Sequence, residues 1–373
     1  MNCDFLVIGG GIAGASVAYE LAGRGGSVIL AEREHVTGYH TTGRSAAAYL
    51  QTYGSPAVRA LTRASKAFYD APPEGFCQYP LLTPRGALQT SDADPQNIRL
   101  IEQELEDDKD NGFLKRVELS ELGEMCPVLN LDAVSIAYYE QGAMDVDVNA
   151  LLTGYLAGFR QRGGTVLVNA EVDKLTRVGN VWQVSTRAGM IEAGVVVNAS
   201  GAWADVLAEM AGTRTVGITP LRRTAVTFDP GFDISKLQLT GDVAENWYFR
   251  PEGGDLMISP ADETPSEPCD AQPEELDIAI IIDRIETVTS MKVKRIISSR
   301  AGLRSFVDDH SPVVGYADDV EGFFWLAGQG GYGIQMAPAL AKLAASLAVD
   351  GGMPPSSDDW GLTLKDVLPS RFG

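Results

Sequence analysis

Cysteine and histidine are scarce in this chain of 373 residues, which has four cysteines and three histidines. The cysteines stand far apart, without a CxxC pair or the ligand spacing of a zinc site, so we predict no metal centre. They are Cys3, Cys77, Cys126 and Cys269. Long apolar runs are also missing, since none approaches the ~18 residues of a membrane span. With no signal-peptide pattern at the start, we expect a cytoplasmic protein without a membrane span.

Positive charge is the other shortage. Thirty Lys and Arg residues stand against fifty Asp and Glu residues, which leaves a formal net charge of −20. Such a surface repels nucleic acid and anionic lipid, so we expect neither as a partner. An anionic substrate would need a local pocket of positive charge, and the few arginines therefore become candidates for such a pocket.

Glycine, in contrast, is abundant, with forty residues. Three of them form the pattern Gly9-x-Gly11-x-x-Gly14 directly after the apolar segment 4–8, DFLVI, and at the start of a helix-like segment. Gly9 permits a tight turn, Gly11 lets a pyrophosphate approach the backbone, and Gly14 lets the helix pack closely on the strand. The first helical turn adds free N–H groups and a positive dipole end, which favour phosphate binding.

The segment SVILAE then predicts a second strand, with Glu32 at its end, eighteen residues beyond Gly14. A carboxylate there accepts hydrogen bonds from ribose hydroxyls and disfavours a 2′-phosphate. The unit predicts a dinucleotide site but leaves FAD and NAD equally open.

Strand, helix and glycine-loop patterns recur near residues 150–210 and 320–348, with period-2 alternation between them over 216–260. We therefore predict an α/β protein in which a Rossmann-like cofactor domain is interleaved with a smaller α+β domain built on a mainly antiparallel sheet. The predicted cofactor domain comprises residues 1–84, 146–215 and 305–373. The predicted substrate domain comprises residues 85–145 and 216–304.

Several separated motifs together resemble the D-amino-acid oxidase-like family of FAD enzymes. They are GYHTTGRSAA, PLLTPRG, VVVNASGAWAD, RAGLRSF and EGFFWLAGQGGYGIQ, in that order along nearly the whole chain. The chain looks closest to the bacterial D-arginine dehydrogenases. The resemblance implies FAD as the cofactor, and it implies that the bare segment after Glu32 runs beneath the flavin.

The resemblance also implies a set of cofactor-binding positions. A second glycine loop and helix start would lie at the pyrimidine end of the flavin, where a positive helix end stabilises the reduced anion. No cysteine follows Cys269, so we expect non-covalent FAD. The predicted cofactor residues are Gly9, Gly11, Ile12, Ala13, Gly14, Glu32, Arg33, Thr42, Gly43, Arg44, Ser45, Ala46, Ala47, Val172, Ala199, Gly201, Trp203, Gly302, Gly330, Gly331, Tyr332, Gly333, Ile334 and Gln335.

For the substrate, strand alternation in PLRRTAVTF places Arg222 and Arg223 on opposite faces. The resemblance implies that Arg222 faces the substrate and that Arg304 completes a clamp on its carboxylate, which an arginine fork binds bidentately. Tyr248 would cap the carboxylate and Tyr53 would lie on a lid. We predict Tyr53, Arg222, Tyr248 and Arg304 as catalytic and substrate-binding residues, with Gly331 beside the substrate.

Two departures from D-arginine dehydrogenase concern substrate choice. Ala48 stands where that branch has a histidine, and Ala87 stands where it has the acid that receives the guanidinium. Because a buried cation without a carboxylate partner is strongly disfavoured, we expect that D-Arg and D-Lys are not the best substrates. Two truncations would also enlarge the pocket for a bulkier apolar or N-substituted amino acid.

The implied reaction is oxidation of a D-amino acid to an imino acid, which water hydrolyses to a keto acid and ammonia. We expect no dedicated catalytic base. The electron acceptor is left open between O2 and a quinone or other carrier. The alternatives are oxidation of a secondary or N-substituted amino acid (glycine/sarcosine oxidase-like or D-proline dehydrogenase-like), an NAD-dependent dehydrogenase, or a non-catalytic flavoprotein.

Overall fold

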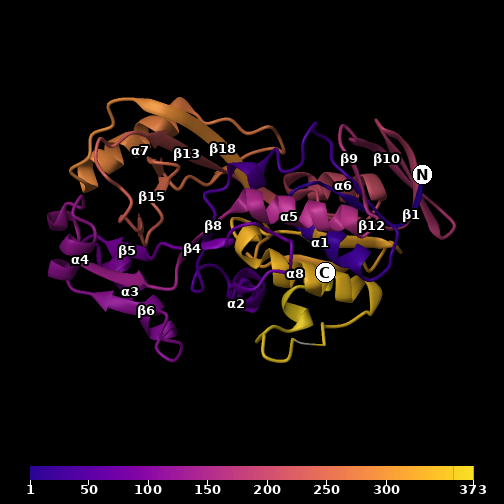
Figure 1. Ribbon diagram of the computed structural model, residues 1–373, viewed down its shortest axis with the longest axis horizontal. Helices are drawn as coiled ribbons and strands as arrows, with labels where there is room; N and C mark the ends of the chain where they lie inside the picture. Colours follow the sequence, from indigo (N-terminus) through magenta and orange to yellow (C-terminus); the bar gives the residue numbers. More distant parts are fainter. Residues whose placement is uncertain (356, 373) are drawn as a thin grey trace.

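A computed structural model describes residues 1–355 and 357–372. Residues 356 and 373, which belong to the predicted third segment of the cofactor domain, lie outside the described residues. Two large sheets and one small sheet organise the chain, and Figure 1 shows the large sheets at opposite ends of the molecule.

The first large sheet has eight strands and holds the N-terminus. β1 lies centrally and runs parallel to both β2 and β12, while β10 and β11 add an antiparallel edge. Helices α5 and α8 both pack on α1, and α6 packs against β10 and β12. The strands are β1 (Asn2–Ile8), β2 (Val28–Ala31), β9 (Thr165–Leu167), β10 (Val172–Val178), β11 (Val181–Thr186), β12 (Gly189–Asn198), β19 (Val313–Tyr316) and β20 (Phe323–Ala327); the helices are α1 (Ile12–Gly23), α5 (Val148–Gln161), α6 (Ala204–Ala211) and α8 (Gly333–Val349).

The second large sheet has nine strands, all antiparallel to their neighbours except β14 beside β5. Helix α7 packs against β13 and β16, and α3 packs against β5 and β7. The strands are β5 (Ala87–Ser91), β6 (Leu114–Val117), β7 (Ile136–Glu140), β13 (Thr219–Phe228), β14 (Leu239–Asp242), β15 (Tyr248–Glu252), β16 (Asp255–Ser259), β17 (Thr264–Pro265) and β18 (Ile296–Phe306); the helices are α3 (Pro95–Asp107), α4 (Leu119–Met125) and α7 (Glu275–Val288).

A small sheet of β3 (Ala48–Tyr49), β8 (Met144–Val146) and β4 (Leu82–Pro84) and the helix α2 (Pro56–Asp70) complete the fold. Helix α2 begins after Ser55, because Pro56 fits its first turn and the Ser55 hydroxyl accepts a hydrogen bond from the N–H of Val58 at 3.4 Å. In the same way, Asp147 caps α5 by accepting from the N–H of Ala150 at 2.8 Å.

The predicted fold class is confirmed: a Rossmann-like α/β part is interleaved along the chain with a mainly antiparallel α+β part. The exact domain boundaries stay a prediction. Among the helices of the described residues, none combines the length and the apolar character needed to cross a lipid bilayer.

Candidate functional site

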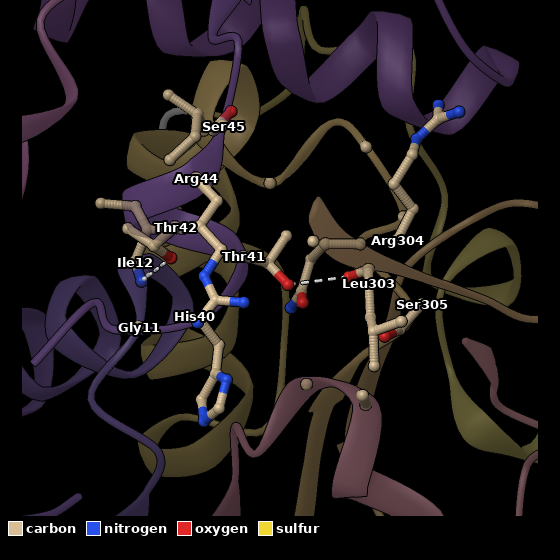
Figure 2. Close-up of a pocket in the computed structure, with 18 of the residues that line it drawn as sticks. Gly11, Ile12, His40, Thr41, Thr42, Arg44, Ser45, Leu303, Arg304 and Ser305 are labelled. Carbon is tan, nitrogen blue, oxygen red and sulfur yellow. Dashed lines mark hydrogen bonds between the residues drawn. The ribbon is translucent and has the colours of Figure 1, made fainter. Parts of the chain in front are cut away.

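A cavity of about 460 Å³ lies between the carboxyl end of β1 and the strands β13 and β18. Residues from both large sheets line it, together with the segment that follows Glu32 (Figure 2). The predicted cofactor residues that line it are Gly9, Gly11, Ile12, Ala13, Glu32, Arg33, Thr42, Arg44, Ser45, Ala46, Ala47, Val172, Ala199, Gly201, Trp203, Gly302, Gly330, Gly331, Gly333, Ile334 and Gln335.

The glycine turn between β1 and α1 is shaped by backbone crowding. Gly9 has φ of +109°, and a Cβ at this residue would lie 2.3 Å from the carbonyl oxygen of Ala199. A Cβ on Gly14 would lie 1.9 Å from the carbonyl oxygen of Gly9, so Gly14 lets α1 pack on the turn and does not line the cavity. Gly11 caps α1 and does line the cavity.

Glu32 directly follows the second strand, which ends at Ala31, and lines the cavity. Its carboxylate is buried and accepts hydrogen bonds from the N–H of Gly10 at 2.7 Å and the N–H of Glu34 at 2.8 Å. These bonds fix the carboxylate at the end of β2, which is the position that a ribose-binding acid requires.

The segment 40–48 is held in place through hydroxyls and backbone groups. Thr42 Oγ1 accepts from the N–H of Ile12 at 3.0 Å, and Thr41 Oγ1 donates to the carbonyl of Leu303 at 2.8 Å (Figure 2). Gly43 does not line the cavity, because its Cβ position lies 2.5 Å from the carbonyl oxygen of Gly38. Glycine at position 43 therefore allows the backbone to turn closely past Gly38.

Two arginines anchor this segment, Arg250 from outside it and Arg44 from within it. Arg250, 8 % exposed, donates to the carbonyls of Ala46 and Ala47 and pairs with Asp145 at 2.8 Å. Arg44 lines the cavity, but its guanidinium donates to the carbonyl of Ala271 at 2.8 Å and pairs with Asp270. Arg44 therefore joins the segment to the loop before α7.

Several buried polar atoms in the cavity lining fit a hydrogen-bonding cofactor. His40 Nδ1, Gln329 Nε2 and Gln335 Nε2 are buried without a hydrogen-bond partner among the described residues. Gln335 is 3 % exposed and stands in the first turn of α8. Because buried polar groups are normally paired, these atoms, the glycine turn and Glu32 form a lining that suits a flavin dinucleotide.

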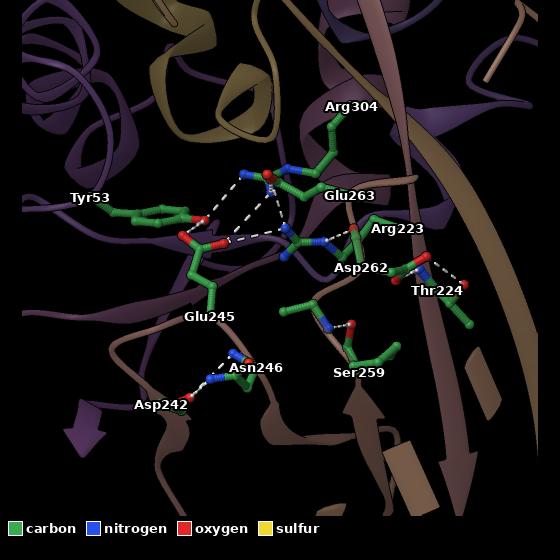
Figure 3. Close-up of polar contacts among 12 residues, drawn as sticks. Tyr53, Arg223, Thr224, Asp242, Glu245, Asn246, Ser259, Asp262, Glu263 and Arg304 are labelled. Atoms are coloured by element: carbon green, nitrogen blue, oxygen red, sulfur yellow. Dashed lines mark hydrogen bonds and ion pairs between the residues drawn. The ribbon is translucent and has the colours of Figure 1, made fainter. Parts of the chain in front are cut away.

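At one wall of the cavity two arginines, a tyrosine and two glutamates form a cluster (Figure 3). The Tyr53 hydroxyl lies 3.1 Å from both Arg304 Nη2 and Glu245 Oε1. Arg304 Nη1 lies 2.7 Å from Glu263 Oε1, and Arg223 Nη2 lies 3.0 Å from the same oxygen and 3.3 Å from Glu245 Oε2. Arg223 and Arg304 thus both form ion pairs with Glu263.

The protonation states in this cluster are set by burial and charge. Burial raises the pKa of Tyr53 well above its ordinary value although the charge of Arg304 opposes this, so the phenol stays neutral and can donate. Burial lowers the pKa of Arg304, but Tyr53, Tyr332, Glu245 and Glu263 outweigh burial and raise it, so this guanidinium stays charged.

The prediction that Arg222 faces the substrate is wrong, because the cavity face of β13 carries Arg223. Arg222 points to the opposite face, where it pairs with Asp277 at 3.0 Å and also with Glu274, both from the α7 region. Arg223 instead donates from Nε to the carbonyl of Asp262 at 2.9 Å and lines the cavity.

Two other predicted positions do not line the cavity. Ala87 is 2 % exposed and packs in a small cluster with Ala143 and Leu239, one layer behind the partly buried Ala48, which does line it. Tyr332 packs edge-on against Tyr53 with ring centres 4.9 Å apart and so supports that residue from behind. Ala87 and Tyr332 therefore lie behind residues that line the cavity.

The remaining predicted substrate residues, Tyr53, Tyr248, Arg304 and Gly331, line the cavity. Gly331 is required by Arg304, since a Cβ there would lie 2.3 Å from the Arg304 Nε atom. Sequence reasoning gave no site role to other lining residues, among them Gln89, Arg223, Leu239, Gly241, Asp242, Glu245, Trp247, Leu303, Ser305 and Gln329. Period-2 alternation from Ala87 could have identified Gln89.

Glu140 holds the segment that carries Tyr53. Its buried carboxylate accepts from the N–H of Gln51 at 2.7 Å and from the Thr52 hydroxyl at 2.6 Å. Burial raises the pKa of Glu140 above 4.5, although both hydrogen bonds oppose this.

A group with a raised pKa in the folded state loses stabilising influence as pH rises through that pKa. The free energy of unfolding of Glu140→Gln is therefore expected to rise relative to that of wild type as pH increases from 4.5 to 8. Thermal unfolding across this pH range measures it, with exposed Glu106→Gln as the control. A difference in the free energy of unfolding that stays constant, or that changes with pH in the opposite direction, would contradict a raised pKa of Glu140.

Comparison with known proteins agrees with this architecture. Over residues 4–347 the chain matches the family of FAD dependent oxidoreductases known as DAO. It is 26% identical over its full length to mitochondrial dimethylglycine dehydrogenase of Homo sapiens and spans 44% of that relative. The chain thus covers less than half the length of the dimethylglycine dehydrogenases that it matches.

Solved structures show the same fold. The L-proline dehydrogenase of P. horikoshii superposes with a TM-score of 0.85 at 22% identity and covers 100% of this chain and 98% of its own. The glycine oxidase of Geobacillus kaustophilus superposes with a TM-score of 0.84 at 21% identity, covering 97% and 99%. With the glycine turn, Glu32 and the cavity in the expected places, the chain belongs to the DAO family of FAD-dependent oxidoreductases.

Proposed function

We propose that this protein oxidises the Cα–N bond of a D-amino acid, with FAD as the oxidant. The support is one juxtaposition: two arginines and the neutral phenol of Tyr53 converge at a wall of the cavity that suits FAD. Arg223 and Arg304 would hold the carboxylate, in place of the pair expected from the sequence. Glu245 and Glu263 keep this region close to neutral, which suits a zwitterion carrying its own ammonium group.

The residues of the chain bind and orient the substrate, and bound FAD supplies the two-electron acceptor. The substrate loses its α-hydrogen with both electrons of the C–H bond, and the neutral amine forms the C=N bond of the imino acid. A proton passes to solvent, and water then hydrolyses the imine to a keto acid and ammonia. Arg304 and Tyr53 fix the carboxylate, so that Cα is held in one orientation.

Oxidation of a secondary or N-substituted amino acid is the second candidate. Dimethylglycine dehydrogenase, sarcosine dehydrogenase and L-proline dehydrogenase among the similar proteins bear names of this class. The same clamp serves both candidates, since only the nitrogen substituents differ. Ala48, which lines the cavity without filling it, leaves room for such a group.

Anaerobic mixing of the flavin-loaded protein with amino acids tests the proposal. We expect D-amino acids to bleach the yellow flavin absorbance, and D-Arg and D-Lys to bleach it more slowly than uncharged ones, because Glu245 and Glu263 are already paired with Arg223 and Arg304. Preferential bleaching by sarcosine or proline would support the second candidate instead. Failure of every amino acid to bleach the flavin would refute both. Oxygen consumption then distinguishes an oxidase from a dehydrogenase with another acceptor.

A further inference from the structure

Gln89 stands on the cavity side of β5, in a position that no predicted role covers. Alternation along β5 places Leu88 in the hydrophobic core, fully buried, and Ala87 and Gln89 on the opposite face. Ala87 is too short to reach the cavity, whereas the longer Gln89 side chain lines it. The amide is therefore the group that this strand presents to a ligand.

The Gln89 amide has no hydrogen-bond partner among the described residues. Its Oε1 atom is buried without a hydrogen bond, and no described residue bonds to its Nε2 atom. Neighbouring polar groups do bond: Thr90 Oγ1 donates to the carbonyl of Gly241 at 3.0 Å. A primary amide offers two donors and an acceptor, and no described residue uses this hydrogen-bonding capacity of Gln89.

The surroundings give this amide no hydrogen-bond partner. Gly241 on β14 is directly opposite Gln89, and a Cβ there would lie 3.3 Å from the Gln89 Oε1 atom. The apolar side chains of Leu50 and Leu239 also line the cavity and cannot bond to an amide. Asp242, one residue further along β14, is occupied, since its carboxylate accepts from Asn246 Nδ2 and the N–H of Ala244.

We propose that Gln89 selects substrates whose side chain ends in an uncharged group that both donates and accepts hydrogen bonds, above all a carboxamide. This inference rests on the proposed amino acid oxidation and specifies its substrate class. A carboxamide pairs with the Gln89 amide through two complementary hydrogen bonds. An apolar side chain of the same shape displaces the water from this amide and leaves its polar atoms buried and unpaired, which is costly.

Steady-state kinetics on matched pairs of amino acids test this selection. In the configuration that the enzyme oxidises, asparagine is compared with leucine and glutamine with methionine, because each pair is similar in size. We expect kcat/KM to be about 10- to 100-fold higher for the amide of at least one pair. Alanine, whose methyl group is too short to need the amide, is the reference substrate.

Gln89→Leu removes the amide at similar volume. This variant is expected to lose the amide preference and to favour the apolar member of each pair, which is read from the ratio of the two kcat/KM values. Gln183→Leu, on β11 of the other sheet and outside the cavity lining, is the matched control and should keep the wild-type preference. Unchanged preference in Gln89→Leu would overturn the inference.

A second variant keeps the test decisive if Gln89→Leu does not fold. Gln89→Glu places a carboxylate at the same position and should move the preference towards lysine and arginine by about 10-fold or more. Titration of the flavin spectrum with the same amino acids reports binding without turnover. If wild type oxidises no amino acid, the proposed function fails; if it oxidises them with no amide preference, only the present inference fails.

Discussion

Arg304→Met is expected to reduce kcat/KM for the best amino acid by about 30-fold to several thousand-fold, because the substrate carboxylate would then be buried without its charged hydrogen-bond partner. Arg304 is 7 % exposed, lines the cavity and bonds to Tyr53 and Glu263. Arg223→Met should reduce kcat/KM in the same direction. Steady-state assays on flavin-loaded protein measure both effects.

The neighbouring Arg222 provides a matched control. Arg222→Met removes the same charge one residue away, but from the face of β13 that pairs with Asp277 and Glu274. It is expected to lower the free energy of unfolding, by about 3 kcal/mol, and to leave kcat/KM within about threefold. Equal loss of kcat/KM in Arg222→Met and Arg223→Met would contradict the assignment of the cavity face.

Gly14→Ala is expected to lower the free energy of unfolding by at least about 3 kcal/mol, since its Cβ would lie 1.9 Å from the carbonyl oxygen of Gly9 and α1 would have to shift. Because this contact is between two backbone segments, no side chain can move to relieve it. Thermal unfolding of the FAD-free protein measures the loss. Wild-type stability in this variant would contradict the close packing of α1 on the turn.

Gly11→Ala separates cofactor binding from folding. The nearest atom to its Cβ would be Thr42 Oγ1 at 3.2 Å, and its φ of −74° suits alanine, so the fold should tolerate it. The new methyl group would lie where the backbone meets the pyrophosphate. We expect the FAD-free protein to unfold as wild type does, while the dissociation constant for FAD rises about 5- to 150-fold. Unchanged FAD affinity would show that the cofactor does not approach Gly11.

The cofactor half of the site was predictable from the sequence because its signals are local. Gly9, Gly11 and Glu32 all lie within one β–α–β unit of about thirty residues, whose geometry follows from short connections and glycine positions. The segment 42–47, directly after that unit, was identified through the family resemblance, which its small side chains fit. Each of these positions lines the cavity, except Gly43, which serves the turn itself.

The substrate half was predicted less well because it depends on where separate strands are placed. Period-2 alternation along β13 predicts that Arg222 and Arg223 lie on opposite faces of the strand. The packing of α7 against β13 decides that the Arg222 face is covered. Side-chain length decides likewise between Ala87 and Gln89, which share one face of β5 while only the longer residue reaches the cavity.

Glu245 and Glu263 show most clearly which residues could not be predicted from the sequence. They are eighteen residues apart and far from Tyr53 in sequence, yet all three meet at the arginine pair. No spacing rule connects them, because their meeting depends on the pairing of β13, β15, β16 and β18 across the second sheet. The sequence alone determined the fold class, the dinucleotide turn and the acid beside it, all of which arise from neighbouring residues. Only the tertiary structure decided which arginine faces the cavity and which polar groups surround it, because long-range strand packing brings those groups together.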